Sequence, residues 1–205
     1  AEANIDKFDP LVIQNARGWR KKITDNIYIN QQDWWHPNDV NLFPSDFKSD
    51  IFGPDDLLIS AKGYNLLFIV SINDLKIKWF SQGLTQAQHD PDWISPDSFI
   101  VFDNRSNLNP SSKFSVIKSF DFKTSKFNTL FDGEIYSAVT NHSGGSSLYG
   151  EHLLMTLTGQ GRHILVNLEN NDLIAELFVL YNQKKQNLTE AKLVSQKVLD
   201  TISKC

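Results

Sequence analysis

The chain has 205 residues, of which 40% are hydrophobic and 21% charged, and its 14 Phe, 5 Trp and 5 Tyr supply enough apolar surface for one packed domain or a large part of one. The formal net charge is -4 at pH 7 and there is no basic stripe, which argues against nucleic acid and anionic membranes as partners. Cys205 is the single cysteine, so the chain holds neither an internal disulfide nor a cysteine-rich metal site.

Short runs of β-branched and aromatic residues, broken by Asn, Asp, Gly and Ser, follow one another through most of the chain and predict an all-β fold. In chain order, strands are expected at 26–30, 56–61, 66–72, 76–80, 98–103, 114–122, 127–131, 134–139, 152–158, 162–168 and 172–178.

The pattern changes near the C-terminus, where residues 182–205 are expected to form an amphipathic helix that packs on the outside of the sheets or on a partner. Its apolar positions recur at helical spacing: Leu188, Ala191, Val194, Val198 and Ile202. No apolar run approaches the ~18 residues of a membrane-spanning helix.

Three segments follow one plan, in which a strand, a polar turn and a second strand ending in a large apolar residue succeed each other. They are residues 66–80, 114–131 and 163–178, and each is preceded by a further strand. A repeat of about fifty residues with four antiparallel strands is typical of a β-propeller blade, whereas an open sandwich, the alternative, lacks such a repeated unit. We therefore predict about three four-stranded blades of a β-propeller over residues 26–181.

Three blades are fewer than the roughly four to eight of a closed propeller, and an open arc leaves strand edges unpaired. The first ten residues contain neither an initiator methionine nor the apolar stretch of a signal peptide. We therefore expect the chain to be the C-terminal part of a larger propeller, with residues 1–25 as an N-terminal segment or the remnant of a preceding blade.

Two of the repeats open with the same arrangement of polar residues. In each, a histidine followed by Pro or Asp-Pro precedes a strand, and a cation follows that strand; the pairs are His36 with Lys62 and His89 with Arg105. Because the first strand of each blade lines the central channel of a propeller, equivalent positions of successive blades converge on one axial site. We therefore expect these four side chains to face a common funnel.

The other histidines are interpreted as structural, since a lone histidine near a strand start usually forms structural hydrogen bonds. They are His142, His152 and His163, and Arg162 is a further candidate for the funnel. A metal site is not expected, because the chain has no HxH, HExxH or CxxC motif, and the GxSxG elbow of a serine hydrolase is absent as well.

Residues 36–40, 55–80 and 85–106 (HPNDV, DDLLISAKGYNLLFIVSINDLKIKWF and TQAQHDPDWISPDSFIVFDNRS) resemble the aryl sulfotransferase (arylsulfate sulfotransferase) β-propeller family. The resemblance extends over roughly residues 30–180 and is most specific in QHDPDWI and FIVFDN. These largely bacterial, PAPS-independent enzymes move a sulfuryl group from one phenol to another. The resemblance implies a phenolic sulfate donor and a phenol acceptor as small-molecule partners, no metal or nucleotide cofactor, and a periplasmic or exported location.

The resemblance also implies residue roles. His89 corresponds to the histidine that becomes sulfurylated, and His36 with Asn38 corresponds to a His-x-Asn element. Lys62 stands where well-studied members carry arginine, which implies a weaker clamp on a sulfuryl group because lysine is a point charge. A further catalytic histidine from an earlier blade has no counterpart in this chain.

Transfer of a sulfuryl group spreads negative charge over its oxygens, and cations or hydrogen-bond donors offset that charge. The residues expected to bind the substrate are Asn38, Lys62, Asn104, Arg105 and Arg162, with His36 as a second catalytic residue. Trp34, Trp35 and Trp93 are candidates to pack against a phenolic ring, although core packing would explain them equally well.

The alternative function is a non-catalytic β-propeller that serves as a binding or scaffold module and keeps the fold and its loop motifs without turnover. Lys62 and the missing blades favour this alternative, whereas the block around His89 favours the enzyme.

Overall fold

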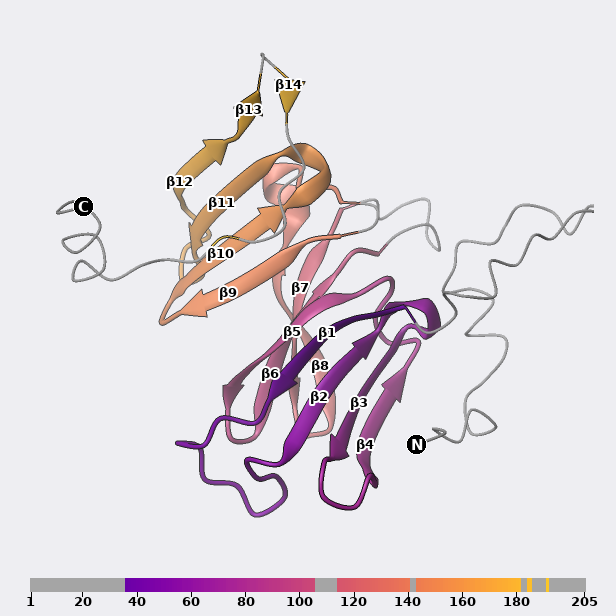
Figure 1. The fold of residues 1–205 in the computed structure, drawn as a ribbon. Coiled ribbons are helices and arrows are strands. Elements are labelled where there is room, and N and C mark those ends of the chain that lie inside the picture. Colours follow the sequence, from indigo (N-terminus) through magenta and orange to yellow (C-terminus); the bar gives the residue numbers. More distant parts are fainter. Residues whose placement is uncertain (1–35, 106–113, 141–142, 182–183, 186–190, 192–205) are drawn as a thin grey trace, which may run out of the picture.

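The structure, a computed structural model, describes residues 36–105, 114–140, 143–181, 184–185 and 191 (Figure 1). The predicted strand at 26–30 lies outside these residues, as do residues 1–25 and all of the predicted C-terminal helix except its residues 184–185 and 191. Within the described part of the chain, no helix is long and apolar enough to cross a membrane.

The described chain forms three four-stranded antiparallel sheets, each built from strands that follow one another in the sequence. They are blades of a β-propeller, as the repeat predicts. The first blade consists of β1 (Pro37–Leu42), β2 (Asp56–Ala61), β3 (Leu66–Ser71) and β4 (Ile77–Gln82). The second consists of β5 (His89–Ser95), β6 (Ser98–Asp103), β7 (Val116–Asp121) and β8 (Lys126–Asp132). The third consists of β9 (Gly145–Tyr149), β10 (His152–Leu157), β11 (Arg162–Asn167) and β12 (Leu173–Phe178). A short pair, β13 (Leu180–Tyr181) and β14 (Lys184–Lys185), follows, so the helix predicted over 182–205 is wrong at residues 184–185, which pair as a strand.

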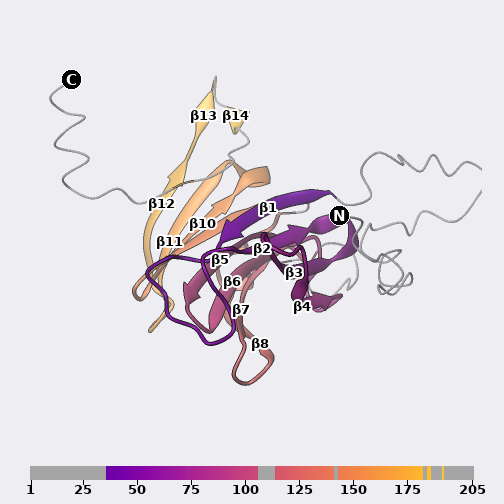
Figure 2. The ribbon, with the colours of Figure 1, turned by 60° about the horizontal axis from the view of Figure 1, so that its bottom comes forward.

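The second blade lies between the other two, and its strand β6 shows why (Figure 1 and Figure 2). Successive side chains of a strand point to opposite faces of the sheet. Phe99 and Val101 are buried in the core shared with the first blade, whereas Ile100 and Phe102 are buried in the core shared with the third. A strand with both faces covered needs a continuous apolar run, and residues 99–102 supply it.

The core between the first and second blades is a cluster of aromatic rings. Trp93 packs against Phe43 with ring centroids 5.0 Å apart and against Phe52 at 5.3 Å, and only 8% of Trp93 is exposed. Full burial of such a ring contributes roughly 1.5 to 3 kcal/mol or more. Trp93 is therefore a core residue, while Trp34 and Trp35, the other two candidates for substrate packing, lie outside the described residues.

The innermost strand of each blade was not predicted. β1, β5 and β9 lie side by side at the inner edge of the three sheets, and β5 carries hydrogen bonds to both neighbours. The strands at 56–61 and 98–103, which were expected to line the channel, are the second strands of their blades. The inner strands are polar and carry register shifts in β1 and β5, so they lack the apolar alternation by which a strand is recognised.

The strand predicted at 134–139 is wrong. Gly133–Tyr136 form a short 3-10 turn, η4. The Asp132 carboxylate caps this turn by accepting the backbone N–H of Glu134 at 3.0 Å, and Ser137 ends it with a φ of 52°. Local side-chain capping here overrides the strand preference of the Ile-Tyr pair.

Candidate active site

The predicted site residues lie at one end of the blades, which we call the His89 end. His89 begins β5, and Asn104 and Arg105 directly follow β6, so antiparallel pairing brings these three to the same end of the second blade. In the first blade, His36 and Asn38 stand at the start of β1, and Lys62 follows β2. Arg162 begins β11 at the same end of the third blade.

The backbone fixes the imidazole of His89 at one ring nitrogen. Nδ1 lies 2.9 Å from the carbonyl oxygen of Ala87 and 2.9 Å from the amide nitrogen of Asn104. A carbonyl oxygen only accepts hydrogen bonds, and a bare ring nitrogen at this distance would oppose it with a second lone pair. The Asn104 side-chain nitrogen, which only donates, favours a bare Nδ1 instead, so the two contacts select opposite tautomers. The tautomer with the proton on Nδ1 keeps the bond to Ala87 and leaves the ring lone pair on Nε2. Such a tautomer suits a nucleophile that attacks through Nε2.

Asn104 is buried beside this imidazole, with 1% of its surface exposed. Its side-chain nitrogen donates to the Ala87 carbonyl at 2.5 Å, and its side-chain oxygen accepts the hydroxyl of Thr140. Both ends of the amide are thus engaged within the protein. The structure places Asn104 against His89, whereas the sequence predicts that Asn104 binds the substrate.

The loop that leads into His89 is held by the carboxylate of Asp103, the last residue of β6. Asp103 is 1% exposed; its Oδ1 accepts the backbone N–H of Gln86 at 2.9 Å, and its Oδ2 pairs with Lys118 Nζ at 2.7 Å. Lys118 also donates to the carbonyl of Leu84 at 2.6 Å. Sequence reasoning missed both charged residues, although the Phe-Asp-Asn end of the FIVFDN block contains Asp103.

Gln88 joins the same loop to the first blade. It is fully buried, and its side-chain nitrogen donates to the Leu66 carbonyl at 3.1 Å and to Ser60 Oγ at 3.2 Å. Its backbone carbonyl accepts the Asn38 side-chain amide at 2.7 Å. Asn38 therefore links β1 to the residue directly before His89. Its side-chain oxygen Oδ1 is buried and accepts no hydrogen bond in the described structure.

Several residues other than glycine adopt left-handed backbone conformations at the His89 end. Among them are His36, Ala87, Asp90 and Arg105, with φ values of 39°, 48°, 53° and 45°. Such conformations cost of order 1 kcal/mol or more for residues with a Cβ, and they collect at functional sites. Ala87 has no polar side chain to compensate, so the surrounding hydrogen bonds must maintain its conformation.

His36 and Lys62 meet through the backbone, because the Lys62 N–H donates to the His36 carbonyl at 3.1 Å. Lys62 begins a short 3-10 turn, η3 (Lys62–Tyr64), which ends at Asn65 in the left-handed region. The Asn65 side chain accepts the Ala87 N–H at 2.8 Å. The turn that carries Lys62 is thereby tied to the loop that carries His89.

A family model described as Arylsulfotransferase (ASST) matches residues 10–178. The chain belongs to the arylsulfotransferase family. No curated protein matches the chain. The resemblance inferred from HPNDV, QHDPDWI and FIVFDN is therefore confirmed at the level of the family.

Solved structures similar to this chain are distant. Apo AztD from Citrobacter koseri is 10% identical with a TM-score of 0.42, and the match covers 70% of this chain and 35% of AztD. A chain of a nidogen/laminin complex is 7% identical with a TM-score of 0.35, covering 64% of this chain and 62% of the other. The β-propeller domain of the Trilobed protease from Pyrococcus furiosus is 15% identical with a TM-score of 0.35, covering 60% and 38%. The chain thus spans about a third of AztD and less than two thirds of the other two.

The two arginines expected in the arylsulfotransferase funnel are engaged in ion pairs. Arg105 Nη1 lies 3.6 Å from the carboxylate of Asp132, at the end of the outermost strand of the second blade. Arg162 pairs with Glu176 of the outermost strand β12 and donates to the carbonyl of Tyr136 at 2.7 Å. The described contacts of Arg162 therefore join the second blade to the outer edge of the third and do not lead to His89.

The remaining histidines have local contacts. His163 is 8% exposed, and its Nδ1 lies 3.1 Å from Thr156 Oγ1; burial lowers the pKa of its imidazole below the ordinary value of 6.5. His152 Nε2 lies 3.8 Å from the carboxylate of Glu151. His142 lies outside the described residues. Among the described residues, no three His, Cys, Asp or Glu side chains gather closely enough to hold a metal ion.

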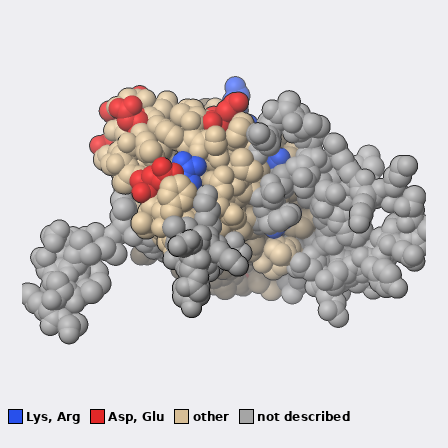
Figure 3. Space-filling model, turned by 90° about the horizontal axis from the view of Figure 1, so that it is seen from above, with Lys and Arg blue, Asp and Glu red and all other residues tan. Residues whose placement is uncertain are grey.

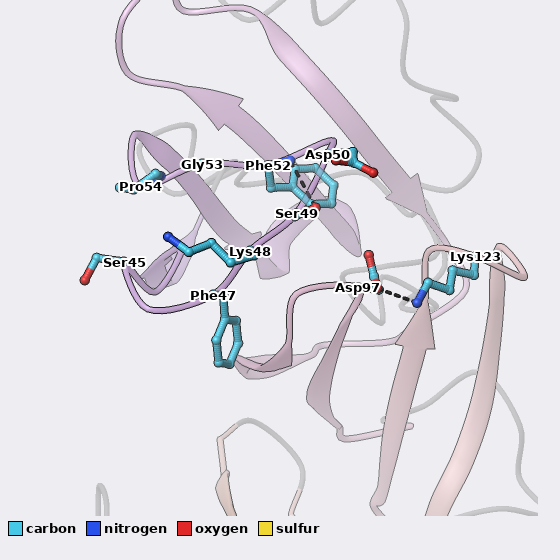
Figure 4. Close-up of a pocket in the computed structure, with 10 residues that line it drawn as sticks. All are labelled: Ser45, Phe47, Lys48, Ser49, Asp50, Phe52, Gly53, Pro54, Asp97 and Lys123. Carbon is cyan, nitrogen blue, oxygen red and sulfur yellow. Dashed lines mark hydrogen bonds and ion pairs between the residues drawn. The ribbon is translucent and has the colours of Figure 1, made fainter.

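A shallow pocket of about 580 Å³ lies at the opposite end of the first two blades (Figure 4). It is lined by residues 45–54 of the loop between β1 and β2 and by the turns carrying Asp97 and Lys123. Asp97 and Lys123 pair at 2.6 Å, so its charges are partly neutralised within the protein. On the face seen in Figure 3, the visible Lys and Arg side chains form no patch.

Proposed function

We propose that this chain supplies the nucleophilic histidine of an aryl sulfotransferase, and that His89 carries a sulfuryl group from an aryl sulfate to a phenol. The observation that carries the proposal is the 2.9 Å contact between His89 Nδ1 and the Ala87 carbonyl, which supports the tautomer with its lone pair on Nε2. Membership of the arylsulfotransferase family supports it.

In the first step, Nε2 attacks the sulfur of the donor, and the bond between sulfur and the aryl oxygen breaks. The phenolate leaves with the bonding electron pair, so no base is needed. The imidazole retains its Nδ1 proton and becomes positively charged, and the Ala87 carbonyl, already 2.9 Å from Nδ1, stabilises that charge. In the second step, an acceptor phenolate attacks the sulfur, and the sulfur–nitrogen bond breaks to return the lone pair to Nε2.

The first blade supplies the groups that would offset negative charge on the sulfuryl oxygens. We assign this role to His36, to Lys62 and to the second N–H of the Asn38 side-chain amide, because all three residues stand at the His89 end and the Asn38 amide also donates to the carbonyl of the residue before His89. Charged and polar donors fixed before the reaction stabilise a transition state without reorganisation. Arg105 stands at the same end of the second blade, where its guanidinium pairs with the carboxylate of Asp132.

The experiment is to incubate the protein with 4-nitrophenyl sulfate and no acceptor, and then to map the adduct by mass spectrometry under neutral conditions. We expect one sulfuryl group on His89, released by acid because protonation makes the imidazole a better leaving group, and ping-pong kinetics when a phenol is added. His89→Asn should abolish the adduct, whereas His36→Asn should slow its formation without preventing it. His152→Asn serves as the control, because the described ion pair of His152 is with its neighbour Glu151 and not with a residue at the site. An adduct on another residue would exclude His89 as the nucleophile.

The second candidate is a non-catalytic propeller that binds aryl sulfates or other partners. The ion pairs of Arg105 and Arg162, together with Lys62 in place of arginine, favour it because they leave fewer cations for a sulfuryl group. Binding of 4-nitrophenyl sulfate in calorimetry without release of nitrophenolate would support this candidate over the enzyme.

A further inference from the structure

We infer that Thr140 and Ser115 position the imidazole of His89 through Asn104, in a chain of hydrogen bonds with one fixed direction. The inference rests on the proposed function of His89, and it names residues outside the motifs from which that function was argued. Both act through Asn104, so both are positioning residues.

The direction of the chain is set at its end, by the carbonyl of Ala87. This oxygen accepts from His89 Nδ1 at 2.9 Å and from Asn104 Nδ2 at 2.5 Å. Because it has no proton to give, the nitrogen of the Asn104 amide must face it, and the amide oxygen must face the other way. Rotation of the amide by half a turn would set two oxygens against each other.

The amide oxygen then requires a donor, and Thr140 provides it. The Thr140 hydroxyl donates to Asn104 Oδ1, which uses its only proton. Ser115 Oγ lies 3.3 Å from Thr140 Oγ1 and accepts the Thr140 backbone N–H at 3.1 Å. Since the Thr140 proton is already used, the Ser115 hydroxyl is the donor available to this contact, and it also lies 3.5 Å from the Thr140 carbonyl as a second acceptor. The chain of hydrogen bonds thus runs from Ser115 to Thr140 to Asn104 and ends at the carbonyl of Ala87.

Burial makes this order obligatory. Ser115, Thr140 and Asn104 are 0%, 2% and 1% exposed, so water does not replace a lost partner at low cost. Networks of buried polar groups specify one arrangement when every member is satisfied, and they lose that property when one member is removed. Without the Thr140 hydroxyl, Asn104 Oδ1 loses its buried donor, and the Ala87 carbonyl remains as the described contact that distinguishes the two orientations of the amide.

The rotated amide would present its oxygen to His89 Nδ1–H and draw that proton away from the Ala87 carbonyl. The ring would then turn about its bond to the backbone, and Nε2 would leave the direction that the Ala87 contact defines. Thr140 lies between η4 and β9, in the connection from the second blade to the third. The histidine of β5 is in this way held by the segment that leads into the next blade.

The test compares Thr140→Val, which keeps the shape and removes the hydroxyl, with Thr140→Ser, which keeps the hydroxyl. Thr156→Val is the matched control, because Thr156 is also 2% exposed and its hydroxyl contacts His163 in the third blade. Two measurements are made on each protein. The first is the single-turnover rate of sulfuryl transfer from 4-nitrophenyl sulfate to the enzyme, and the second is the 15N chemical shift of the two His89 ring nitrogens by NMR.

We expect the wild type, Thr140→Ser and Thr156→Val to show a protonated Nδ1 on His89 and similar rates. Thr140→Val should shift the Nδ1 resonance and slow the transfer about 10- to 100-fold with little change in binding of the aryl sulfate, since misplacement of a reacting group acts on the chemical step. Ser115→Ala should give smaller changes in the Nδ1 resonance and in the transfer rate. This variant replaces Thr140→Val in the test if Thr140→Val does not fold.

The two readouts separate this inference from the proposed function. A shifted Nδ1 resonance in Thr140→Val, in a protein whose wild type forms no sulfuryl adduct, supports the positioning chain and overturns the proposed function. An unchanged Nδ1 resonance in both Thr140→Val and Ser115→Ala overturns the positioning chain, whatever happens to the rate.

Discussion

Asp103 and Lys118 form an ion pair inside the second blade, with Lys118 Nζ 2.7 Å from Asp103 Oδ2 and the carboxylate side chain 1% exposed. The pair spans β6 and β7, which are hydrogen-bonded neighbours, and its two members also hold the backbone at Gln86 and Leu84. A buried pair is costly to break because the remaining charge has no partner. The loop before His89 thus depends on a charge pair in the interior of the blade.

Lys118→Met should therefore destabilise the protein by about 2 to 4 kcal/mol, at the lower end for buried pairs because Lys118 is itself 19% exposed. The control is Lys76→Met, which breaks a pair with Asp74 whose side chains are 80% and 47% exposed and should cost less than about 1 kcal/mol. Chemical denaturation gives both values. Equal losses in the two variants would contradict the role of the buried pair.

Lys62 should contribute to sulfuryl transfer through its charge. Lys62→Ala should lower kcat/KM for an aryl sulfate about 10- to 100-fold, whereas Lys62→Arg should retain or raise it, because the guanidinium contacts two sulfuryl oxygens at once. Lys126→Ala, a change at an exposed position of β8, should leave kcat/KM unchanged. Equal rates for Lys62→Ala and Lys62→Arg would remove Lys62 from the site.

His163 should make the protein less stable in acid. Burial lowers the pKa of its imidazole in the folded state below 6.5, so the unfolded chain binds more protons as the pH falls through that value. The free energy of unfolding should therefore decrease between pH 7.5 and pH 5.5, and His163→Gln should show a smaller decrease over this range. Identical pH dependence in His163→Gln and the wild type would contradict this assignment.

Gly144 should tolerate no side chain, because a Cβ at this position would lie 2.6 Å from the ring of Phe102. Phe102 is fully buried and pairs with His89 across β5 and β6, so its ring cannot move without disturbing the site. Gly144→Ala should cost about 1 to 3 kcal/mol, the usual range for overpacking. Gly159→Ala, whose Cβ would meet nothing within 4 Å, should be nearly neutral. Thermal unfolding of the two variants decides between these outcomes.

Much of the fold follows from the sequence alone. The apolar runs at 56–61, 66–72, 98–103 and 162–168 become central strands, because a strand covered on both faces must be apolar throughout. The repeat of about fifty residues and the family resemblance are determined by the order of residues along the chain, and both agree with the blades and the family match. The roles of His36 and His89 in catalysis stay predictions.

Only the tertiary structure assigned the inner strands and the partners of the site residues. β1, β5 and β9 are polar, and contacts between blades hold them in place. One such contact joins Asn41 to Asp92 at 2.7 Å, and no local sequence pattern predicts it. For the same reason the sequence predicts Asn104 as a substrate contact, although the side chain is buried against His89, and no sequence motif includes Thr140, 36 residues away in the chain. Hydrogen bonds between distant segments depend on how the blades pack. The sequence shows which groups are able to form hydrogen bonds, but only the packing of the blades decides which of these groups come into contact.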